Sequence, residues 1–317
     1  MQYRSKSNRI SRRRFLGSAA AFAGLSLIPG GLAFGKNQPS PVIRFAKGVN
    51  LGVITYSYRS MPHSAVDLTD WVRYAGLNSV ELMGHTIEQY AGAPEPEGFF
   101  FRGRRHVREM REWRTSVSMD RFRELRQIYN NAGINIDITK LGRPDWSDEE
   151  IDYAFNVAKT LGSRGITFEI GIDSAKRMAP FAERHGLYAI MHNHGQPGRR
   201  GFSFKEHLAF SRNLMLNLDV GHYWGATGSH PNHVIEKYHD RIISLHIKDK
   251  TGPNERPSDT NMPFGEGSTP LGDILRLLRD GGWPITADIE LEYPIPPGSN
   301  AVEEVKKCAD YCRGLLA

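Results

Sequence analysis

The chain has 317 residues, of which 39% are hydrophobic and 24% are charged, and its formal net charge is +6. This composition excludes a chain that is disordered throughout, and the length suits one large globular domain or two ordinary ones. The only cysteines are Cys308 and Cys312, four positions apart in a helical pattern. They exclude a disulfide framework and provide too few thiolates for a metal site.

Residues 1–35 differ in composition from the rest of the chain. They contain six basic residues, no acidic ones, and then a run rich in Ala, Leu, Phe and Gly. The pair Arg12 and Arg13 ahead of this run resembles the twin-arginine (Tat) motif. It predicts a Tat-type signal peptide, a linker at 36–47 and a periplasmic or otherwise extracytoplasmic location. Because the apolar run is short and contains Pro29, no stable membrane anchor is expected after cleavage. The alternative is a basic arm that binds nucleic acid, followed by a membrane helix.

The positive charge is concentrated in this segment. Of the 41 Lys and Arg residues, 35 lie beyond residue 35, and the same part of the chain carries 35 Asp and Glu residues. The remaining chain therefore has no overall charge that would attract nucleic acid, and we expect no nucleic-acid partner.

Beyond residue 48, short apolar runs rich in β-branched residues alternate with longer stretches of helical periodicity. The predicted strands lie at 51–55, 78–83, 134–139, 165–170, 187–192, 214–219, 242–247 and 285–291. The predicted helices lie at 64–75, 119–132, 147–162, 173–185, 203–212, 231–239, 270–280 and 300–316. This alternation indicates parallel βα units, so the predicted fold class is α/β, a single-domain (β/α)8 TIM barrel over residues 48–317.

Two segments lack a clear pattern, 84–117 and 251–268. Both follow predicted strands, which would place them over the mouth of the barrel, where ligands bind. The first contains the Arg-rich run FRGRRHVREMREWR. Such a run is typical of a solvated helix or a lid, with a nucleic-acid contact as the alternative.

The side chains that close the predicted strands are polar almost throughout. In a barrel of this kind, catalytic groups lie at the C-terminal ends of the strands. Glu290, Glu169 and Lys248 are therefore predicted to act as acid or base groups. The predicted substrate contacts are Glu81, His194, His222, Tyr56 and Lys140.

Carboxylates and imidazoles without thiolates suit a divalent ion such as Mn, Zn, Mg or Co. Asp219, His246 and Glu290 close three consecutive predicted strands, so we expect their side chains to point toward one centre. The stretch LYAIMHNHG offers a fourth ligand. His192 is favoured, and His194 points the same way if the strand continues, because strand side chains alternate with a period of two. A hydrogen-bonding role for His192, without metal contact, is the alternative.

At NLDVGHYW, SLHIKDK and ADIELEY the chain resembles the xylose isomerase-like TIM barrel superfamily, the sugar phosphate isomerase/epimerase group, over nearly all of residues 48–317. It is particularly similar to members with a Tat signal and a C-terminal helix like VEEVKKCADYC, and HNHG resembles one subgroup. In relatives that interconvert ketoses, a Glu on the fifth strand holds a metal together with residues that correspond to Asp219, His246 and Glu290. In this chain, His192 stands at the position of that Glu.

The resemblance implies an exported, divalent-metal-dependent isomerase or epimerase. It would act on a sugar or keto-sugar through an enediolate, with Glu290 moving the proton. Glu292 is the alternative ligand at the eighth strand, and Glu169 is an alternative source of a carboxylate near the metal. In the ketose epimerases, two metal-bound glutamates transfer protons on opposite faces of the substrate. A metal-bound imidazole cannot replace a carboxylate base, so His192 argues against this two-glutamate mechanism in the present chain.

Three other functions stay open at this point. A lyase or dehydratase would form the same intermediate and expel a β-substituent. A non-catalytic barrel would bind metal or sugar without turnover. A DNA-repair nuclease shares this barrel but needs a richer cluster of ligands, for three zinc ions. The preferred hypothesis has a small carbohydrate as the partner and leaves a homo-oligomer open.

Overall fold

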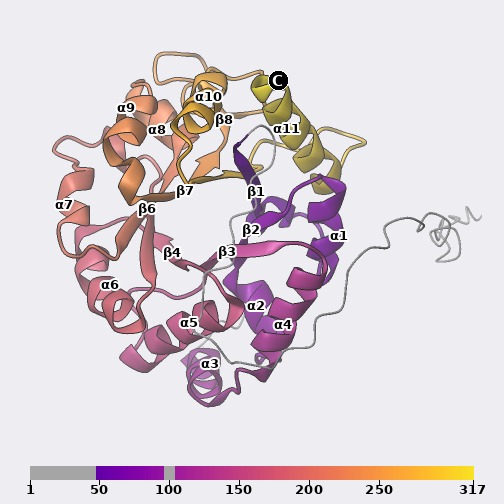
Figure 1. Ribbon diagram of the computed structural model, residues 1–317, viewed down its shortest axis with the longest axis vertical. Helices are drawn as coiled ribbons and strands as arrows, with labels where there is room; N and C mark the ends of the chain where they lie inside the picture. The colour runs from indigo at the N-terminus through magenta and orange to yellow at the C-terminus, as the bar shows by residue number, and fades with distance from the viewer. Residues whose placement is uncertain (1–47, 96–103) are drawn as a thin grey trace, which may run out of the picture. The chain divides into compact units, whose positions relative to one another are not determined.

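Eight parallel strands close into a barrel at the centre of the molecule, with helices around it (Figure 1). The structure is a computed structural model that describes residues 48–95 and 104–317, so the predicted signal peptide and linker lie outside the described residues. Thr286 closes the barrel, pairing in register with Ser244 on one side and Asn50 on the other. The strands are β1 Asn50–Ile54, β2 Ser79–Met83, β3 Asn135–Lys140, β4 Gly165–Glu169, β5 Tyr188–His192, β6 Leu214–Asp219, β7 Ile242–Ile247 and β10 Thr286–Ile289. The predicted (β/α)8 barrel is confirmed.

All eight predicted helices are present, although the one expected at 203–212 is shorter. They are α1 Asp67–Tyr74, α4 Asp120–Asn131, α5 Asp148–Leu161, α6 Ile172–His185, α7 Phe204–Leu208, α9 Asn232–Tyr238, α10 Leu271–Gly281 and α11 Ala301–Leu316. Helix α5 shows why they form. Ser147 and Glu150 make a capping box at its start, Gly162 ends it with φ 77°, and Ile151 and Phe155 on its apolar face are fully buried.

Three further helices lie outside the eight predicted ones, and one of them, in the Arg-rich run, was expected as a solvated helix or a lid. Two of them, α2 Gly84–Tyr90 and α3 Arg104–Ser116, occupy much of the segment 84–117 that was predicted to be irregular. The third, α8 Val220–Thr227, follows β6 directly, because the Asp219 side chain accepts a hydrogen bond from the backbone N–H of His222 and caps the helix. The segment 251–268 is mostly irregular, and the short strands β8 Asp249–Lys250 and β9 Asn261–Met262 pair across it.

The Arg-rich run forms a helix where it is described. Helix α3 packs against α5, and its Arg114 binds Glu88 (Nε–Oε1 2.7 Å) and Glu150 (Nη1–Oε1 3.1 Å). The Arg114 guanidinium also lies 3.8 Å from the centre of the Trp146 ring. This arginine therefore stabilises the packing of α3 against the barrel.

The main apolar core lies between the strands and the surrounding helices. A separate small cluster consists of Ile138, Ile190, Met215 and Ile243, which come from four different strands and so lie inside the barrel. The interior of such barrels is ordinarily filled with branched apolar side chains. Here buried polar residues share that interior, which marks it as more than a packing core.

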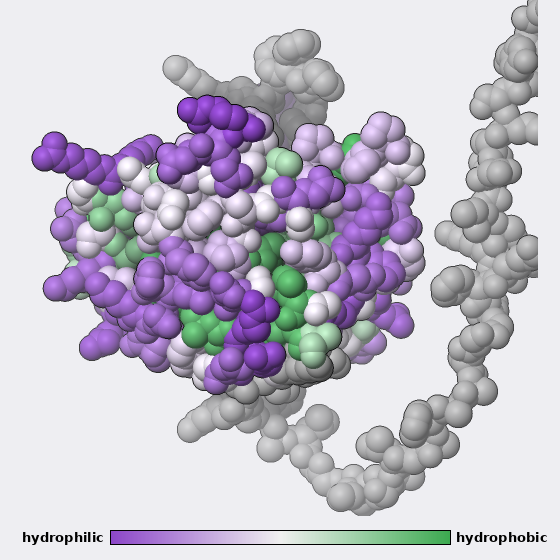
Figure 2. Space-filling view, turned by 90° about the horizontal axis from the view of Figure 1, so that it is seen from above, coloured by the Kyte–Doolittle hydropathy of each residue, from purple (hydrophilic) through white to green (hydrophobic). Residues whose placement is uncertain are grey.

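Hydrophilic side chains predominate on the face shown in Figure 2, with small hydrophobic patches between them. Among the residues that the structure describes, no helix has both the length and the apolar character needed to cross a bilayer.

Candidate metal centre

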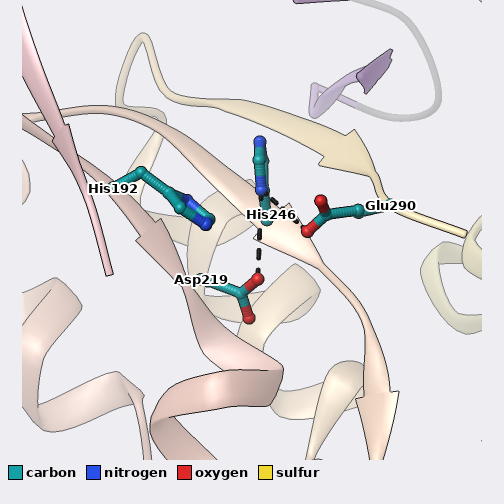
Figure 3. A group of neighbouring side chains, drawn as sticks. All are labelled: His192, Asp219, His246 and Glu290. Carbon is teal, nitrogen blue, oxygen red and sulfur yellow. Dashed lines mark hydrogen bonds and ion pairs between the residues drawn. The ribbon is translucent and has the colours of Figure 1, made fainter. Parts of the chain in front are cut away.

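Four buried side chains from neighbouring strands meet at the C-terminal end of the barrel. His192 and Asp219 end β5 and β6, His246 lies in β7, and Glu290 follows β10. Their exposed fractions are 1%, 0%, 0% and 5%. One ligand atom from each residue lies within 4.8 Å of those of the other three. Figure 3 shows the four side chains pointing toward one another. The strand order of the barrel thus brings together residues that are far apart in the sequence.

The donor set fits a divalent metal ion. His192 Nδ1 is a buried atom without a hydrogen-bond partner, which is unusual for a polar atom inside a protein. Burial lowers the pKa of His192 well below its ordinary value, so the imidazole is neutral and has a lone pair to offer. Two imidazoles and two carboxylates suit Mn, Zn, Co or Mg.

His246 lies among three carboxylates. Its Nδ1 lies 3.0 Å from Glu290 Oε2 and 3.9 Å from Asp219 Oδ2, while its Nε2 lies 2.7 Å from Glu81 Oε2. Burial by itself lowers the pKa of His246, but Glu290 and Glu81 outweigh it and hold the pKa well above the ordinary value. With Nε2–H donating to Glu81, Nδ1 is the ring atom that faces the other candidate ligands.

Glu81 lies in the barrel interior with no exposed surface. Besides His246, its carboxylate accepts hydrogen bonds from the Thr167 hydroxyl and from Asn217 Nδ2, the latter at 2.8 Å. The sequence predicts that Glu81 contacts substrate, and that contact stays a prediction. The observed contacts favour a role in orienting His246.

The Lys248 ammonium lies among three carboxylates. Its Nζ is 3.1 Å from Asp219 Oδ2, 2.8 Å from Glu290 Oε2 and 2.6 Å from Glu292 Oε2. Burial opposes the charge, but these carboxylates raise the pKa of Lys248 above its ordinary value. A lysine held protonated in this way donates hydrogen bonds and does not act as a base. Glu292 lies outside the group of potential ligands, which favours Glu290 at this strand end.

His194, the second histidine of the HNHG stretch, has a different environment from His192. Its side chain is 48% exposed, and Nε2 lies 2.9 Å from Glu169 Oε2. The hydrogen bond to Glu169 raises the pKa of His194. Lys140 binds the other oxygen of Glu169 at 2.9 Å. Burial raises the pKa of Glu169, but hydrogen bonds from His194 and Lys140 bring it down to about 2.

Glu169, His192 and His194 form a second group whose ligand atoms approach within 4.8 Å. The four-residue group is the stronger candidate, because all four of its residues are buried, whereas Glu169 and His194 are exposed.

Two neighbouring residues complete the site. Asn193 is buried, and its side chain makes two hydrogen bonds with the Asp219 backbone, at 3.1 and 3.2 Å, which join the ends of β5 and β6. Sequence reasoning gave Asn193 no role, and its only signal was a polar residue between two histidines. His222 Nε2 lies 3.2 Å from His194 Nδ1. Burial, reinforced by Lys248 and Lys250, lowers the pKa of His222 to about 3.

Tyr56 lies in a 3-10 turn, Thr55–Tyr58, after β1, and the guanidinium of Arg59 lies 4.3 Å from the centre of its ring. Its predicted contact with substrate stays a prediction.

Comparisons with known proteins agree with this architecture. Residues 162–312 match the family model described as "Xylose isomerase-like TIM barrel". No match was found among curated protein sequences. A sugar phosphate isomerase/epimerase from Parabacteroides distasonis is 18% identical, with a TM-score of 0.56, over 83% of this chain and 93% of that one.

Two other solved structures are similar to the chain. A probable 3-DHS dehydratase, AsbF, from Bacillus anthracis is 17% identical, with a TM-score of 0.58, over 83% of this chain and 98% of that one. A D-psicose 3-epimerase determined with D-fructose is 13% identical, with a TM-score of 0.56, over 84% of this chain and 99% of that one. At these identities the likeness concerns the fold.

Proposed function

We propose that the protein is a divalent-metal-dependent isomerase or epimerase that acts on a sugar or keto-sugar through an enediolate. The observation that carries this proposal is the convergence of four buried potential ligands at the strand ends. The match to the xylose isomerase-like family over residues 162–312 and the epimerases among the similar structures support it.

His192, Asp219, His246 and Glu290 would hold the ion. A divalent ion bound there supplies a Lewis acid that polarises a carbonyl and acidifies the neighbouring C–H. Burial raises the pKa of Glu290, but Lys248 and His246 outweigh it and hold the pKa well below the ordinary value. Glu290 is therefore an ionised carboxylate that can take the proton from carbon. Lys248 would donate a hydrogen bond to a substrate oxygen.

The fate of the enediolate decides the product. Return of the proton to the adjacent carbon gives the isomer. Protonation of the original carbon from the opposite face of the enediolate gives the epimer. Protonation from the opposite face of the enediolate needs a second acid. This chain has His192 instead of a carboxylate at the position where ketose-interconverting relatives have a Glu. His194 can serve as that acid, because its raised pKa keeps the half-exposed imidazole protonated to higher pH.

A lyase or dehydratase is the second candidate. The specific observation that favours it is the same pair of groups, a buried carboxylate base in Glu290 and a protonated imidazole in His194. Such a pair can remove a proton from one carbon and protonate a leaving group on the next. The similarity to a probable dehydratase is compatible with this chemistry.

The test measures exchange of the substrate C–H proton with solvent rather than formation of a product. This exchange reveals the enediolate whether it goes on to isomerise, epimerise or eliminate a substituent. The chelated protein is reconstituted with Mn, Zn or Co and incubated with keto-sugars in D2O. NMR then follows deuterium at the carbon next to the carbonyl. We expect metal-dependent exchange that Glu290→Gln removes and that Glu292→Gln retains. Loss of a substituent to give an unsaturated ketone would favour the lyase. An ion bound without exchange on any sugar would contradict both and leave a non-catalytic binding protein.

Export is a separate part of the proposal and rests on residues 1–35 alone. Twin-arginine export requires the arginine pair. We expect Arg12→Lys combined with Arg13→Lys to retain the protein in the cytoplasm, as measured by cell fractionation. Equal distribution of the variant and the native chain would contradict this route.

A further inference from the structure

A cavity of about 590 Å³ opens beside the candidate metal centre and includes none of its four residues. It is formed at the C-terminal ends of β2, β3 and β4 and by the segment that links β3 to α5. We call it the side cavity. Its lining includes His85, Lys140, Arg143, Trp146, Glu169 and Ser174. Its volume falls within the range of about 300–1,000 Å³ that is typical of small-molecule sites.

Glu169 connects the side cavity to the metal centre. It lines the cavity, and it is also the last residue of β4, paired in register with His192 at the end of β5. Its Oε2 lies 2.9 Å from His194 Nε2. A ligand that binds at the metal centre and extends past Glu169 therefore enters the side cavity.

The charges around the side cavity are balanced within the chain. Lys140 binds Glu169 at 2.9 Å, and Arg143 binds Asp145 through two contacts of 2.8 and 2.9 Å. The remaining acid of the lining, Glu88, is bound by Arg114 from α3. Among the described residues of the lining, these pairs therefore leave no Lys or Arg without an acidic partner to neutralise a phosphate or carboxylate ligand.

The rest of the lining is polar without charge, or apolar. Burial lowers the pKa of His85, so its imidazole is neutral near pH 7. Trp146, Phe168 and Leu141 provide apolar surface, and Ser174 provides a hydroxyl. A ring with hydroxyls at its edge and C–H groups on its faces matches such a lining.

We propose that the side cavity is a subsite for a second, uncharged sugar ring, so that the substrate is a disaccharide or another glycoside rather than a free monosaccharide. This inference rests on the proposed function, because it assumes that the reacting sugar occupies the metal centre. The first ring would place its carbonyl at the four buried residues. The second ring would lie past Glu169, between Lys140 and Trp146.

Polyols test the subsite without turnover, because they lack the carbonyl. The probes are lactitol, maltitol and isomalt, each a glycosylated polyol, with sorbitol as the single-unit control. Their affinities for the Mn-loaded full chain are measured by calorimetry. We expect at least one glycosylated polyol to bind about tenfold or more tightly than sorbitol, and to bind more tightly than sorbitol 6-phosphate.

The matched variants are Ser174→Trp, which fills the cavity, and Asp173→Trp, at an exposed neighbour outside the lining. We expect the preference over sorbitol to collapse in Ser174→Trp and to persist in Asp173→Trp. Metal content and thermal unfolding establish that both variants are folded. If Ser174→Trp does not fold, Ser174→Leu fills less of the cavity and is expected to reduce the preference in part.

Three outcomes overturn the subsite. They are equal affinity for all polyols, preference for the phosphorylated polyol, and a preference that survives Ser174→Trp or, in its place, Ser174→Leu. The proposed function is judged separately by deuterium exchange on D-fructose and other keto-sugars. Exchange without a preference for a second ring overturns only the subsite, whereas the absence of both exchange and polyol binding overturns the proposed function as well.

Discussion

The two sides of the barrel mouth differ in how far their polar side chains are exposed to water. At the ends of β5, β6, β7 and β10, the candidate ligands are buried, and His192 Nδ1 lacks a hydrogen-bond partner. At the ends of β2, β3 and β4, the charges form ion pairs around a hollow, and the Glu169 side chain is 51% exposed. Electrostatic interactions are strong where water is excluded and weak where it enters. The first side is therefore suited to chemistry, and the second to recognition.

The largest expected effect is on metal binding, and it distinguishes the candidate metal centre from the cavity side of the barrel mouth. Asp219→Asn should abolish stoichiometric metal binding, because it removes a buried charged ligand while an Asn can still cap α8. We expect an affinity loss beyond the roughly 10–100-fold typical of residues that only support a ligand. Elemental analysis after reconstitution measures it. Glu169→Gln, on the cavity side, should retain one ion per chain, and loss of the ion in that variant would move the metal centre to β4.

Glu81→Gln tests whether a residue inside the barrel orients the metal centre. An amide can donate as well as accept, so it no longer fixes Nε2 of His246 as the donor. We expect metal affinity to fall about 10–100-fold. Glu88→Gln is the matched control, because Glu88 is a buried carboxylate bound to Arg114 on the cavity side. Equal affinities for the two variants would contradict the orienting role.

The two histidines of the HNHG stretch should respond differently. His192→Gln removes a buried imidazole that has a free nitrogen, and we expect about a tenfold or greater loss of metal affinity. His194→Gln alters a half-exposed side chain and should change metal affinity less than about threefold. Titration with Mn or Zn measures both. A larger effect at His194 would favour the second group of ligands with Glu169.

The pH dependence of stability reports His222. Its pKa is about 3 in the folded chain, whereas an unfolded chain titrates it near about 6.5. Below pH 6.5 the unfolded state therefore binds a proton that the folded state does not. Stability then falls as the pH decreases toward 3, by up to about 1.4 kcal/mol per pH unit, and this histidine contributes no slope above pH 6.5. Urea unfolding of the chelated protein should show a shallower slope for His222→Asn, and an unchanged slope would contradict the assignment.

The smallest effect is expected on the cavity side. Lys140→Met breaks the ion pair with Glu169, which is partly exposed and screened by water. We expect a loss of about 1 kcal/mol or less in the free energy of unfolding. If the free energy of unfolding fell as much as it does when a buried ion pair is broken, the ion pairs on the two sides of the barrel mouth would be equally strong, and the comparison would fail.

Much of the fold was predictable from local sequence patterns. The strand predicted at 187–192, for instance, corresponds to Tyr188–His192. Helices α2 and α8 were missed because each begins directly after a strand and is only one or two turns long. Asp219 ends the strand and caps the helix with the same side chain, so the pattern of β6 conceals the start of α8.

The candidate metal centre was also partly predictable from local sequence patterns. A closed barrel brings consecutive strand ends together, so polar residues at those ends converge. The contact between Glu81 and His246 spans 165 positions and depends on side chains inside the barrel, which strand periodicity does not resolve. The side cavity likewise depends on the packing of irregular segments. The neutralisation of its charges can be recognised only once the structure shows the ion pairs that Lys140 and Arg143 form.

Lys248 gives the metal centre a tethered cation of its own. Its ammonium contacts Asp219, Glu290 and Glu292, so part of the repulsion among these carboxylates is already offset within the folded chain. Chelation should therefore leave the barrel folded, unlike small domains that unfold without their metal.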